Sequence, residues 1–205
     1  MNDNYCDTCP DCLKTKFKGK LIGFMAKKHG GKDTSASHLS DVYGFKTLKF
    51  ADPLKKACKA MFNFTSEQLE ITKETIDPRW KITPRHAFQF VGTELVRNHI
   101  DELIPGIGAD FWVKNMEMRI RKLRSVNSNV NISISDVRFQ NEVNMILRLG
   151  GIIIKIERPL SGTEKDNHPS EVFMDQIENY DQLIINDGTI YDLFQKVDNV
   201  LEKYP

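Results

Sequence analysis

The sequence predicts an α/β fold in which helices cover both faces of a parallel central sheet. Short apolar segments that suit buried strands alternate with longer segments whose apolar residues recur every three or four positions. This alternation is typical of parallel sheets, whose strands are joined by crossover helices. The chain has 205 residues, of which 40% are hydrophobic, and this suits one globular domain with a full core, with or without a small insert.

Residues 20–50 are expected to form a strand, a loop, a helix and a second strand. The first strand, over residues 20–25, contains the apolar run from Leu21 to Met25. The helix is expected from about residue 33 to 42, because Gly44 is a fitting glycine for its C-terminal end. Residues 45–50 indicate the second strand.

The middle of the chain is expected to be helical with one irregular segment. A helix starts at Asp52-Pro53, since proline suits a first turn, and its spacing predicts a buried stripe of Leu54, Ala57, Cys58, Met61 and Phe62. A short helix follows residue 65, and helical patterns return at about residues 85–103 and 112–123. Residues 70–86 are polar and contain two prolines, which favours a binding loop. A solvated helix face is expected for Arg119, Arg121, Lys122 and Arg124.

The C-terminal third returns to alternating strands and helices. Strands are expected over residues 132–136, 152–157 and 183–186, with a helix at 143–149. The last helix begins near Gly188-Thr189, and its buried stripe is Ile190, Leu193, Phe194, Val197, Val200 and Leu201. Ligands of parallel sheets bind beyond the carboxyl ends of the strands, which is where Ala26, Phe50, Asp136 and Arg158 fall.

The segment between the first strand and the first helix has the layout of a phosphate-binding P-loop. The usual pattern is G-x-x-x-x-G-K-[ST]; here Ala26 stands for the first glycine, Gly31 and Lys32 match, and Asp33-Thr34 follow. Backbone N–H groups of the loop would point at phosphate oxygens, which the helix dipole favours. Lys32 would add a positive charge near the β- and γ-phosphates. A lysine-rich turn that only ends a strand is the alternative.

Charged residues at the ends of other elements suit the same ligand. Asp136 ends a strand, where a carboxylate can hold Mg²⁺ between phosphates, directly or through water; capping of the next turn is the alternative. Guanidinium groups match phosphate geometry, and five lie at loop or helix-start positions: Arg79, Arg85, Arg97, Arg138 and Arg158. Trp80 and Trp112 could stack on a base, with a place in the core as the alternative for Trp112.

Composition narrows the class of partner. With a net charge of only +1, we expect that the protein does not bind a nucleic acid polymer. The first residues are polar and contain no signal-peptide core. The longest apolar stretch is too short to cross a bilayer, so we expect a soluble, intracellular protein that binds no membrane. Residues 1–18 are expected to be a polar extension with reduced thiols, because Cys6, Cys9 and Cys12 lack a fourth ligand for zinc.

Many short blocks follow one another in a specific order after residue 19. They are Gly31-Lys32-Asp33-Thr34; Phe50-Ala51-Asp52-Pro53-Leu54-Lys55; Thr83-Pro84-Arg85 with Gln89; Gly92-Thr93-Glu94 with Arg97; Ser135-Asp136-Val137-Arg138-Phe139 with Asn141-Glu142; Gly150-Gly151; Glu157-Arg158-Pro159; His168 with Ser170-Glu171; and Asn186-Asp187-Gly188-Thr189. In this order they resemble the deoxynucleoside monophosphate kinases of tailed phages and large DNA viruses, which are similar to P-loop nucleotide kinases.

The resemblance implies a P-loop NTPase-type three-layer sandwich over residues 19–205, with a helical acceptor-binding region at about 65–128. It implies transfer of the γ-phosphoryl group of ATP to a deoxynucleoside 5′-monophosphate, with Mg²⁺ as cofactor, by a homodimer that binds small-molecule nucleotides. For a viral protein the host cytoplasm is the expected place of action. The resemblance also accounts for Asp33, because aspartate is usual there in the family, whereas Ala26 departs from the more common glycine.

The resemblance also assigns residues to roles. The catalytic residues are Lys32, Asp33 and Arg138. ATP is bound by Ala26, Lys27, His29, Gly30, Gly31, Lys32, Asp33, Thr34 and Arg158. Mg²⁺ is expected at Asp136 and Thr34, directly or through water, and whether Asp33 or Thr34 helps to hold the ion stays open. The acceptor is bound by Lys49, Arg79, Trp80, Arg85, Gln89, Thr93, Glu94, Arg97 and Trp112, with Arg79 and Arg85 at its phosphate.

Two other functions stay open. A kinase for another phosphorylated acceptor, such as phosphomevalonate, shares the Gly-Lys-Asp form of the loop, although Thr83-Pro84-Arg85 and Gly92-Thr93-Glu94 favour a nucleotide. A nucleotide-binding regulatory module without transferase activity is the alternative from another class. Lys32, Asp136 and the acceptor-side arginines argue against it.

Overall fold

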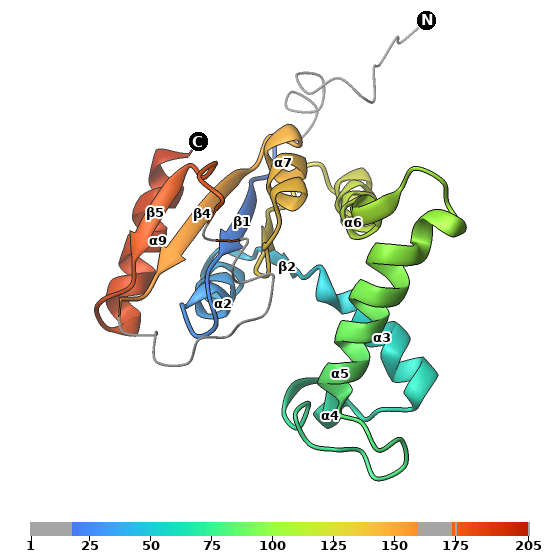
Figure 1. Ribbon diagram of the computed structural model, residues 1–205. Coiled ribbons are helices and arrows are strands. Elements are labelled where there is room, and N and C mark those ends of the chain that lie inside the picture. Colours follow the sequence, from blue (N-terminus) through green and yellow to red (C-terminus); the bar gives the residue numbers. More distant parts are fainter. Residues whose placement is uncertain (1–17, 160–173, 175, 205) are drawn as a thin grey trace, which may run out of the picture. The chain divides into compact units, whose positions relative to one another are not determined.

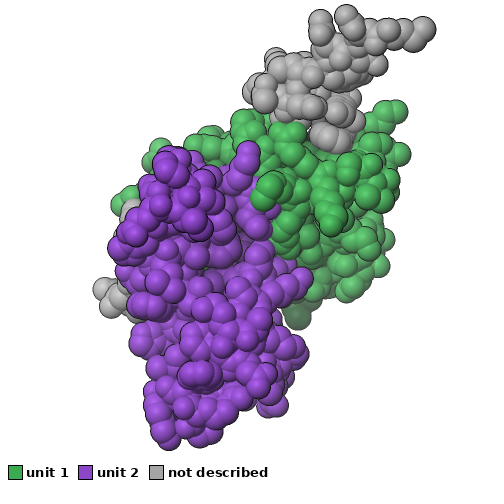
Figure 2. All heavy atoms as spheres, turned by 90° about the vertical axis from the view of Figure 1, so that its right-hand side faces the viewer, with its two compact units in different colours: residues 1–49, 117–205 green, residues 50–116 purple. Residues whose placement is uncertain are grey.

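The computed structural model describes residues 18–159, 174 and 176–204, which form two compact units (Figure 1; Figure 2). One unit, which we call the sheet unit, joins residues 1–49 to residues 117–205. The other, which we call the helical unit, consists of residues 50–116. No helix in the described part of the chain has both the length and the apolar composition that a bilayer span requires.

The sheet unit is built on five parallel strands. They are β1 (Leu21–Met25), β2 (Lys46–Leu48), β3 (Ile132–Ile134), β4 (Ile152–Glu157) and β5 (Gln182–Ile185). The strand order is β2-β3-β1-β4-β5, and every neighbouring pair is parallel. All residues of the central strand β1 are buried, as a strand covered on both faces requires. The predicted α/β fold and its parallel sheet are confirmed.

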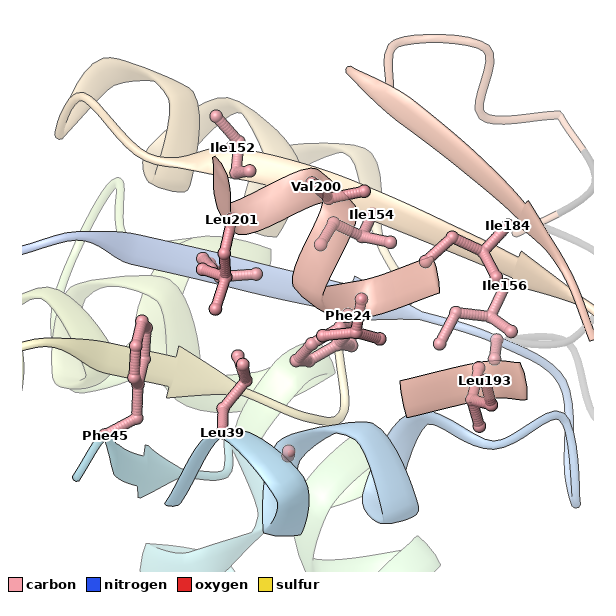
Figure 3. Close-up of a cluster of buried hydrophobic side chains, with 14 residues drawn as sticks. Phe24, Leu39, Phe45, Ile152, Ile154, Ile156, Ile184, Leu193, Val200 and Leu201 are labelled. Carbon is pink, nitrogen blue, oxygen red and sulfur yellow. The ribbon is translucent and has the colours of Figure 1, made fainter. Parts of the chain in front are cut away.

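Helices cover both faces of this sheet, which gives three layers (Figure 1). They are α2 (Lys32–Tyr43), α7 (Gln140–Arg148), α9 (Ile190–Lys203) and the second part of α6 (Phe111–Val126). On one face, α2 and α9 pack on the strands through a buried apolar cluster that includes Phe24, Leu39 and Leu193 (Figure 3). On the other face α7 lies close to β1, because a Cβ on Gly23 would be only 2.8 Å from Ile146 Cδ1. Ile190 was predicted to be buried on α9, and this prediction is wrong, because the residue lies in the first turn and is 64% exposed.

The basic residues of α6 correct one prediction. Arg124, expected on a solvated face, is buried and donates to the carbonyl oxygens of Leu149 and Gly19, each at 3.3 Å. Burial lowers its pKa to about 10. Arg119 donates from Nη1 to the carbonyl oxygen of Lys49 at 2.7 Å. These side chains satisfy backbone carbonyls at the ends of other elements, a role that a run of charge in the sequence does not reveal.

The helical unit consists of short elements around a small core. They are α3 (Ala51–Phe62), α4 (Ser66–Glu70), α5 (Pro84–Gln89), the π-helix η1 (Phe90–Arg97), the 3₁₀ helices η2 (Ile100–Glu102) and η3 (Gly108–Asp110), and the start of α6. Cys58, Phe64, Leu69, Ala87 and Val91 form the buried core. Ala57 and Met61, predicted to be buried on α3, are exposed, because the small core covers only a narrow strip of that helix.

The helix predicted over residues 85–103 is divided into α5, η1 and η2. Within η1 the helix widens, and the N–H of Asn98 donates to the carbonyl of Thr93, five residues back. Gly92 lies inside this segment, and a larger residue would not fit there, because a Cβ would be 2.6 Å from Leu54 Cδ2. π-helical turns within helices are frequent at functional sites, and three predicted acceptor-side residues lie on this one.

Candidate active site

The loop between β1 and α2, residues 26–31, follows the carboxyl end of the central strand. Gly30 N donates to Lys27 O at 3.0 Å, and the first bond of α2 runs from Ser35 N to Gly31 O at 2.9 Å. The chain reverses sharply because His29 and Gly31 have positive φ angles of 61° and 112°. The first N–H groups of α2 have no acceptor within the helix, and such groups bind anions.

The amide of Asn186 fixes this loop from the end of β5. Asn186 Nδ2 donates to Gly30 O at 2.9 Å, and the bond is buried. Gly31 makes room for the amide, since a Cβ there would lie 2.8 Å from Asn186 Nδ2. Ala26 takes the place of the usual glycine without strain, because it is not among the described residues with positive φ.

Asp33 connects three elements at the start of α2. Its Oδ1 accepts from Lys49 Nζ, just after β2, at 2.7 Å, and from Ser135 Oγ, just after β3, at 3.3 Å. Lys32 Nζ lies 3.8 Å from Asp33 Oδ2, and the Lys32 side chain is only 11% exposed. Burial raises the pKa of Asp33, but the hydrogen bonds and charges of Lys49, Lys32 and Ser135 outweigh it, so its pKa is lowered. The carboxylate is therefore ionised at neutral pH.

Asp136 and Thr34 are the residues whose oxygen atoms could hold a magnesium ion. Asp136 follows β3 by two residues, and Thr34 lies in the first turn of the helix that follows β1. Because β1 and β3 are neighbours in the sheet, their carboxyl ends bring the two residues to the same edge. Carboxylate and hydroxyl oxygens suit Mg²⁺, which takes one or two side chains and completes its shell with water and substrate phosphates.

A cavity of about 420 Å³ opens beside the loop. Ala26, Lys27 and Gly30 line it, together with residues 155–159, Met25, Met174 and Ile185. Arg158 is exposed and lies on this wall. Small ligands bind in cavities of roughly 300–1,000 Å³ with mostly apolar walls and a few polar groups, so this one suits the nucleoside part of a nucleotide whose phosphates lie on the loop.

The turn that carries Arg138 is fixed by a buried acid. Glu142, in the first turn of α7, accepts from the backbone N–H groups of Arg138 at 2.8 Å and Phe139 at 3.1 Å. These bonds satisfy two donors at the helix start. They fix the backbone directly after Asp136, so the two predicted site residues Asp136 and Arg138 lie on one ordered turn.

One buried carboxylate organises the loop of the helical unit. Asp77 accepts from Arg79 N, Nε and Nη2 at 2.8, 3.0 and 2.6 Å, and from Gln68 Nε2 at 2.7 Å. The hydrogen bonds from Arg79 hold the pKa of Asp77 well below its usual range. Trp80 donates from Nε1 to Phe62 O at 2.7 Å. Arg79 and Trp80, both predicted to bind the acceptor, are thus held by contacts within their own unit.

The other predicted acceptor-side residues of this unit lie on α5, η1 and α6. Arg85, in the first turn of α5, pairs through Nε with the exposed carboxylate of Glu74. Trp112 is half-buried and donates from Nε1 to Gly92 O at 3.1 Å. Helix α5 and η1 together carry Gln89, Thr93, Glu94 and Arg97.

A family model described as deoxynucleotide monophosphate kinase matches residues 59–197, more than half of the chain. The chain belongs to this family. The resemblance inferred from the sequence blocks is therefore confirmed, and this kinase carries the loop, the lysine and the strand-end carboxylate on one parallel sheet.

Two named relatives and one solved structure are similar to this chain. A protein of Acanthamoeba polyphaga mimivirus, named as a deoxynucleotide monophosphate kinase, is 44% identical over 181 residues, which are 86% of this chain and 93% of that protein. The deoxynucleotide monophosphate kinase of Enterobacteria phage T4 is 29% identical over 128 residues, which are 62% of this chain and 48% of that protein. The thymidylate kinase of Candida albicans is 13% identical, with a TM-score of 0.48 and coverage of 91% of this chain and 92% of that one.

Sequence reasoning missed four residues that position the site of this kinase. Ser135, Glu142 and Asn186 stand in the family blocks without an expected role, and Asp77 lies in the polar segment of residues 70–86. An aspartate two residues before an arginine in a proline-containing loop is a signal that could have indicated the Asp77 contact. Some predictions lie outside the described residues, namely those on Cys6, Cys9, Cys12, His168, Ser170 and Glu171.

Proposed function

We propose that this kinase transfers the γ-phosphoryl group of ATP to a deoxynucleoside 5′-monophosphate and releases ADP and the deoxynucleoside diphosphate. The observation that carries the proposal is the loop of residues 26–31 between a buried central strand and α2, with Lys32 at the helix start, in a chain of this family. The names of the mimivirus and phage relatives support the deoxynucleotide as acceptor.

The sheet unit would hold the donor. Backbone N–H groups of the loop bind the phosphates, Lys32 neutralises charge near the β- and γ-phosphates, and the cavity beside Lys27 and Arg158 takes the nucleoside. When bound at Asp136 and Thr34, Mg²⁺ would neutralise developing charge on the phosphate oxygens. The attacking oxygen belongs to a phosphate that is already an anion, so the chain needs no strong general base.

The helical unit would hold the acceptor. We assign Arg79 and Arg85 to the monophosphate, because guanidinium groups bind phosphate through paired hydrogen bonds. Glu94, Arg97 and Trp80 suit the sugar or the base, and further contacts are assigned to Gln89, Thr93 and Trp112. Lys49, which belongs to the sheet unit, is also assigned to the acceptor side. Arg138 completes charge neutralisation from the donor side.

Two further proposals rest on the family. We infer a homodimer in solution. Size-exclusion chromatography with light scattering tests this by measuring the molar mass. The viral relatives support the cytoplasm of a host cell as the place of action.

A coupled ADP-release assay with Mg²⁺·ATP tests the acceptor. The four common dNMPs, dUMP, their ribose forms and phosphomevalonate are offered in turn, and at least one dNMP should be phosphorylated. Lys32→Ala is the negative control. If only phosphomevalonate is phosphorylated, the acceptor is not a deoxynucleotide. If ATP raises the melting temperature but no monophosphate does, and no acceptor is phosphorylated, the chain is a regulatory module.

A further inference from the structure

Asp33 brings a negative charge to the place where phosphates should bind. A carboxylate beside the loop repels phosphate groups unless other charges neutralise it. In this structure Lys49 Nζ lies 2.7 Å and Lys32 Nζ 3.8 Å from its two oxygens, and Ser135 Oγ donates to Oδ1 at 3.3 Å. The two lysines thus already neutralise the carboxylate. Its short contact with Lys49 Nζ is one that can hold an ammonium group in place.

Lys49 is held at both of its ends. Its carbonyl oxygen accepts from Arg119 Nη1 at 2.7 Å, and its ammonium group reaches Asp33 while the side chain stays 37% exposed. A lysine side chain has four flexible carbons and loses rotamer entropy when it is fixed. The contact with Asp33 therefore determines where the Lys49 charge is found, namely beside the start of α2 at the carboxyl edge of the sheet.

We propose that Asp33 is a positioning residue, which holds the Lys49 ammonium beside the phosphate-binding loop so that Lys49 neutralises charge on the phosphoryl group in transfer. The inference rests on the proposed function. The bond that breaks joins Pγ to the β–γ bridging oxygen, and the bond that forms joins Pγ to an oxygen of the acceptor phosphate. Lys49 forms no covalent bond and moves no proton; it stabilises the charge that develops on the oxygens.

This role separates Asp33 from the residues that suit the metal. The usual loop pattern has Ser/Thr directly after the lysine, and its hydroxyl lies on Mg²⁺. Here Thr34 and Asp136 are the residues assigned to the ion, whereas Asp33 contacts Lys49. A metal-ligand role for Asp33 is therefore the competing hypothesis that the experiments must exclude.

A double-mutant cycle on kcat measures whether Asp33 acts through Lys49. Lys49→Met should lower kcat by about 100-fold, and Asp33→Asn by about 10-fold or more, because a small misplacement of a reacting group is costly. The double variant should be no slower than Lys49→Met alone. Lys46→Met, at the other end of β2, is the matched control and should leave kcat unchanged. Effects of Asp33→Asn and Lys49→Met that multiply would overturn the proposal.

The Mg²⁺ dependence of the rate tests the competing hypothesis. If Asp33 neither binds the ion nor orients one of its ligands, the Mg²⁺ concentration for half-maximal activity in Asp33→Asn should stay within about twofold of the wild-type value. Loss of a group that orients a metal ligand costs about 10–100-fold in metal affinity. A tenfold or larger rise in Asp33→Asn, with no rise in Lys49→Met, would make Asp33 a metal ligand and overturn the proposal.

Chemical labelling tests the ion pair without any activity. In nucleotide-free protein, reductive methylation followed by mass spectrometry should modify Lys49 several-fold more slowly than the exposed Lys46. Asp33→Asn should remove this protection at Lys49 and leave the rate at Lys46 unchanged. Equal rates at Lys49 in the two proteins would overturn the ion pair. If the wild type phosphorylates no dNMP, the proposed function fails, and the labelling still decides whether Asp33 holds Lys49.

Discussion

The two units of this kinase organise their functional residues in different ways. In the sheet unit the backbone does most of the positioning: a buried strand ends, a loop turns at His29 and Gly31, and a helix begins. In the helical unit side chains do it, because Asp77 alone receives four hydrogen bonds and fixes a loop without regular structure. Backbone-defined sites follow from local sequence patterns, whereas side-chain networks depend on residues that only the fold brings together.

The largest expected effect is in the sheet unit. Lys32→Ala should lower kcat by about 10²–10³-fold, because a preorganised charge at the transition state is worth about 3–4 kcal/mol. Steady-state kinetics of the purified variant measure it, with circular dichroism to show that the fold is intact. Lys46→Ala removes a lysine from the same unit and should change little. A near-normal kcat in Lys32→Ala would contradict the phosphate-binding role of the loop.

Arginine variants of the helical unit should act on the acceptor instead. Arg79→Ala or Arg85→Ala should raise the KM for dNMP by about 10–150-fold and the KM for ATP little, since a charge-assisted hydrogen bond is worth roughly 1.5–3 kcal/mol. Lysine should rescue each variant only in part, because it lacks a planar fork. A rise in the KM for ATP alone would show that these residues bind the phosphate donor and not the acceptor.

The same two variants separate a network from an isolated pair. Arg79→Ala leaves Asp77 buried without its main partner, so its thermal midpoint should fall. Arg85→Ala leaves Glu74, which is 62% exposed, and its midpoint should hardly move. Differential scanning calorimetry compares them, and equal midpoints would show that the Asp77 contacts add nothing to the stability of the helical unit.

A smaller effect is expected where a side chain supports the backbone of the loop. Asn186→Ala removes the buried donor to Gly30 O, and a buried acceptor left without a partner costs about 1–3 kcal/mol. Urea unfolding should show this loss, and the KM for ATP should rise while that for dNMP does not. Asn144→Ala, in an exposed hydrogen bond with Gln140, is the control. No loss relative to this control would show that the loop holds its shape without Asn186.

The smallest effect concerns the turn of the loop itself. His29 has a φ of 61°, a left-handed conformation that costs a non-glycine residue roughly 1–2 kcal/mol. His29→Gly should relieve this strain and, after the entropy cost of glycine of about 0.5–1 kcal/mol, raise the unfolding free energy by about 0.5 kcal/mol. His86→Gly, inside α5, should instead lower it by a few tenths. The same sign in both variants would contradict the strain at His29.

The sheet unit could be predicted in outline because its signals are local. Buried strands are apolar runs, and the loop motif is a fixed spacing of residue types, so β1, the loop after it and the strand that precedes Asp136 were predicted directly. The burial of Arg124 was missed, because its carbonyl partners on Gly19 and Leu149 are distant in sequence. Asn186 was missed as a loop support for the same reason.

The helical unit was predicted less well because its elements are short and its core is small. The spacing on α3 indicated a stripe that includes Met61, yet this side chain is 57% exposed. A helical pattern over residues 85–103 gave no sign of the π-helix η1, since a widened turn depends on contacts such as that of Gly92 with Leu54. Periodicity shows which residues can be helical, but it does not show how much of the helix a neighbour covers.

The path of the chain through the two units has a consequence for synthesis on the ribosome. Leu21 of β1 pairs with Ile132 of β3, so the centre of the sheet joins segments separated by the entire helical unit. Residues 50–116 contain all the partners of their own core, and contacts between nearby residues form faster than distant ones. During translation the helical unit can therefore fold first, while the apolar strand β1 waits for β3 and β4 to emerge. In that interval β1 is an unpaired apolar strand open to aggregation, and the loop that follows it obtains its support from Asn186 only after that residue has been made.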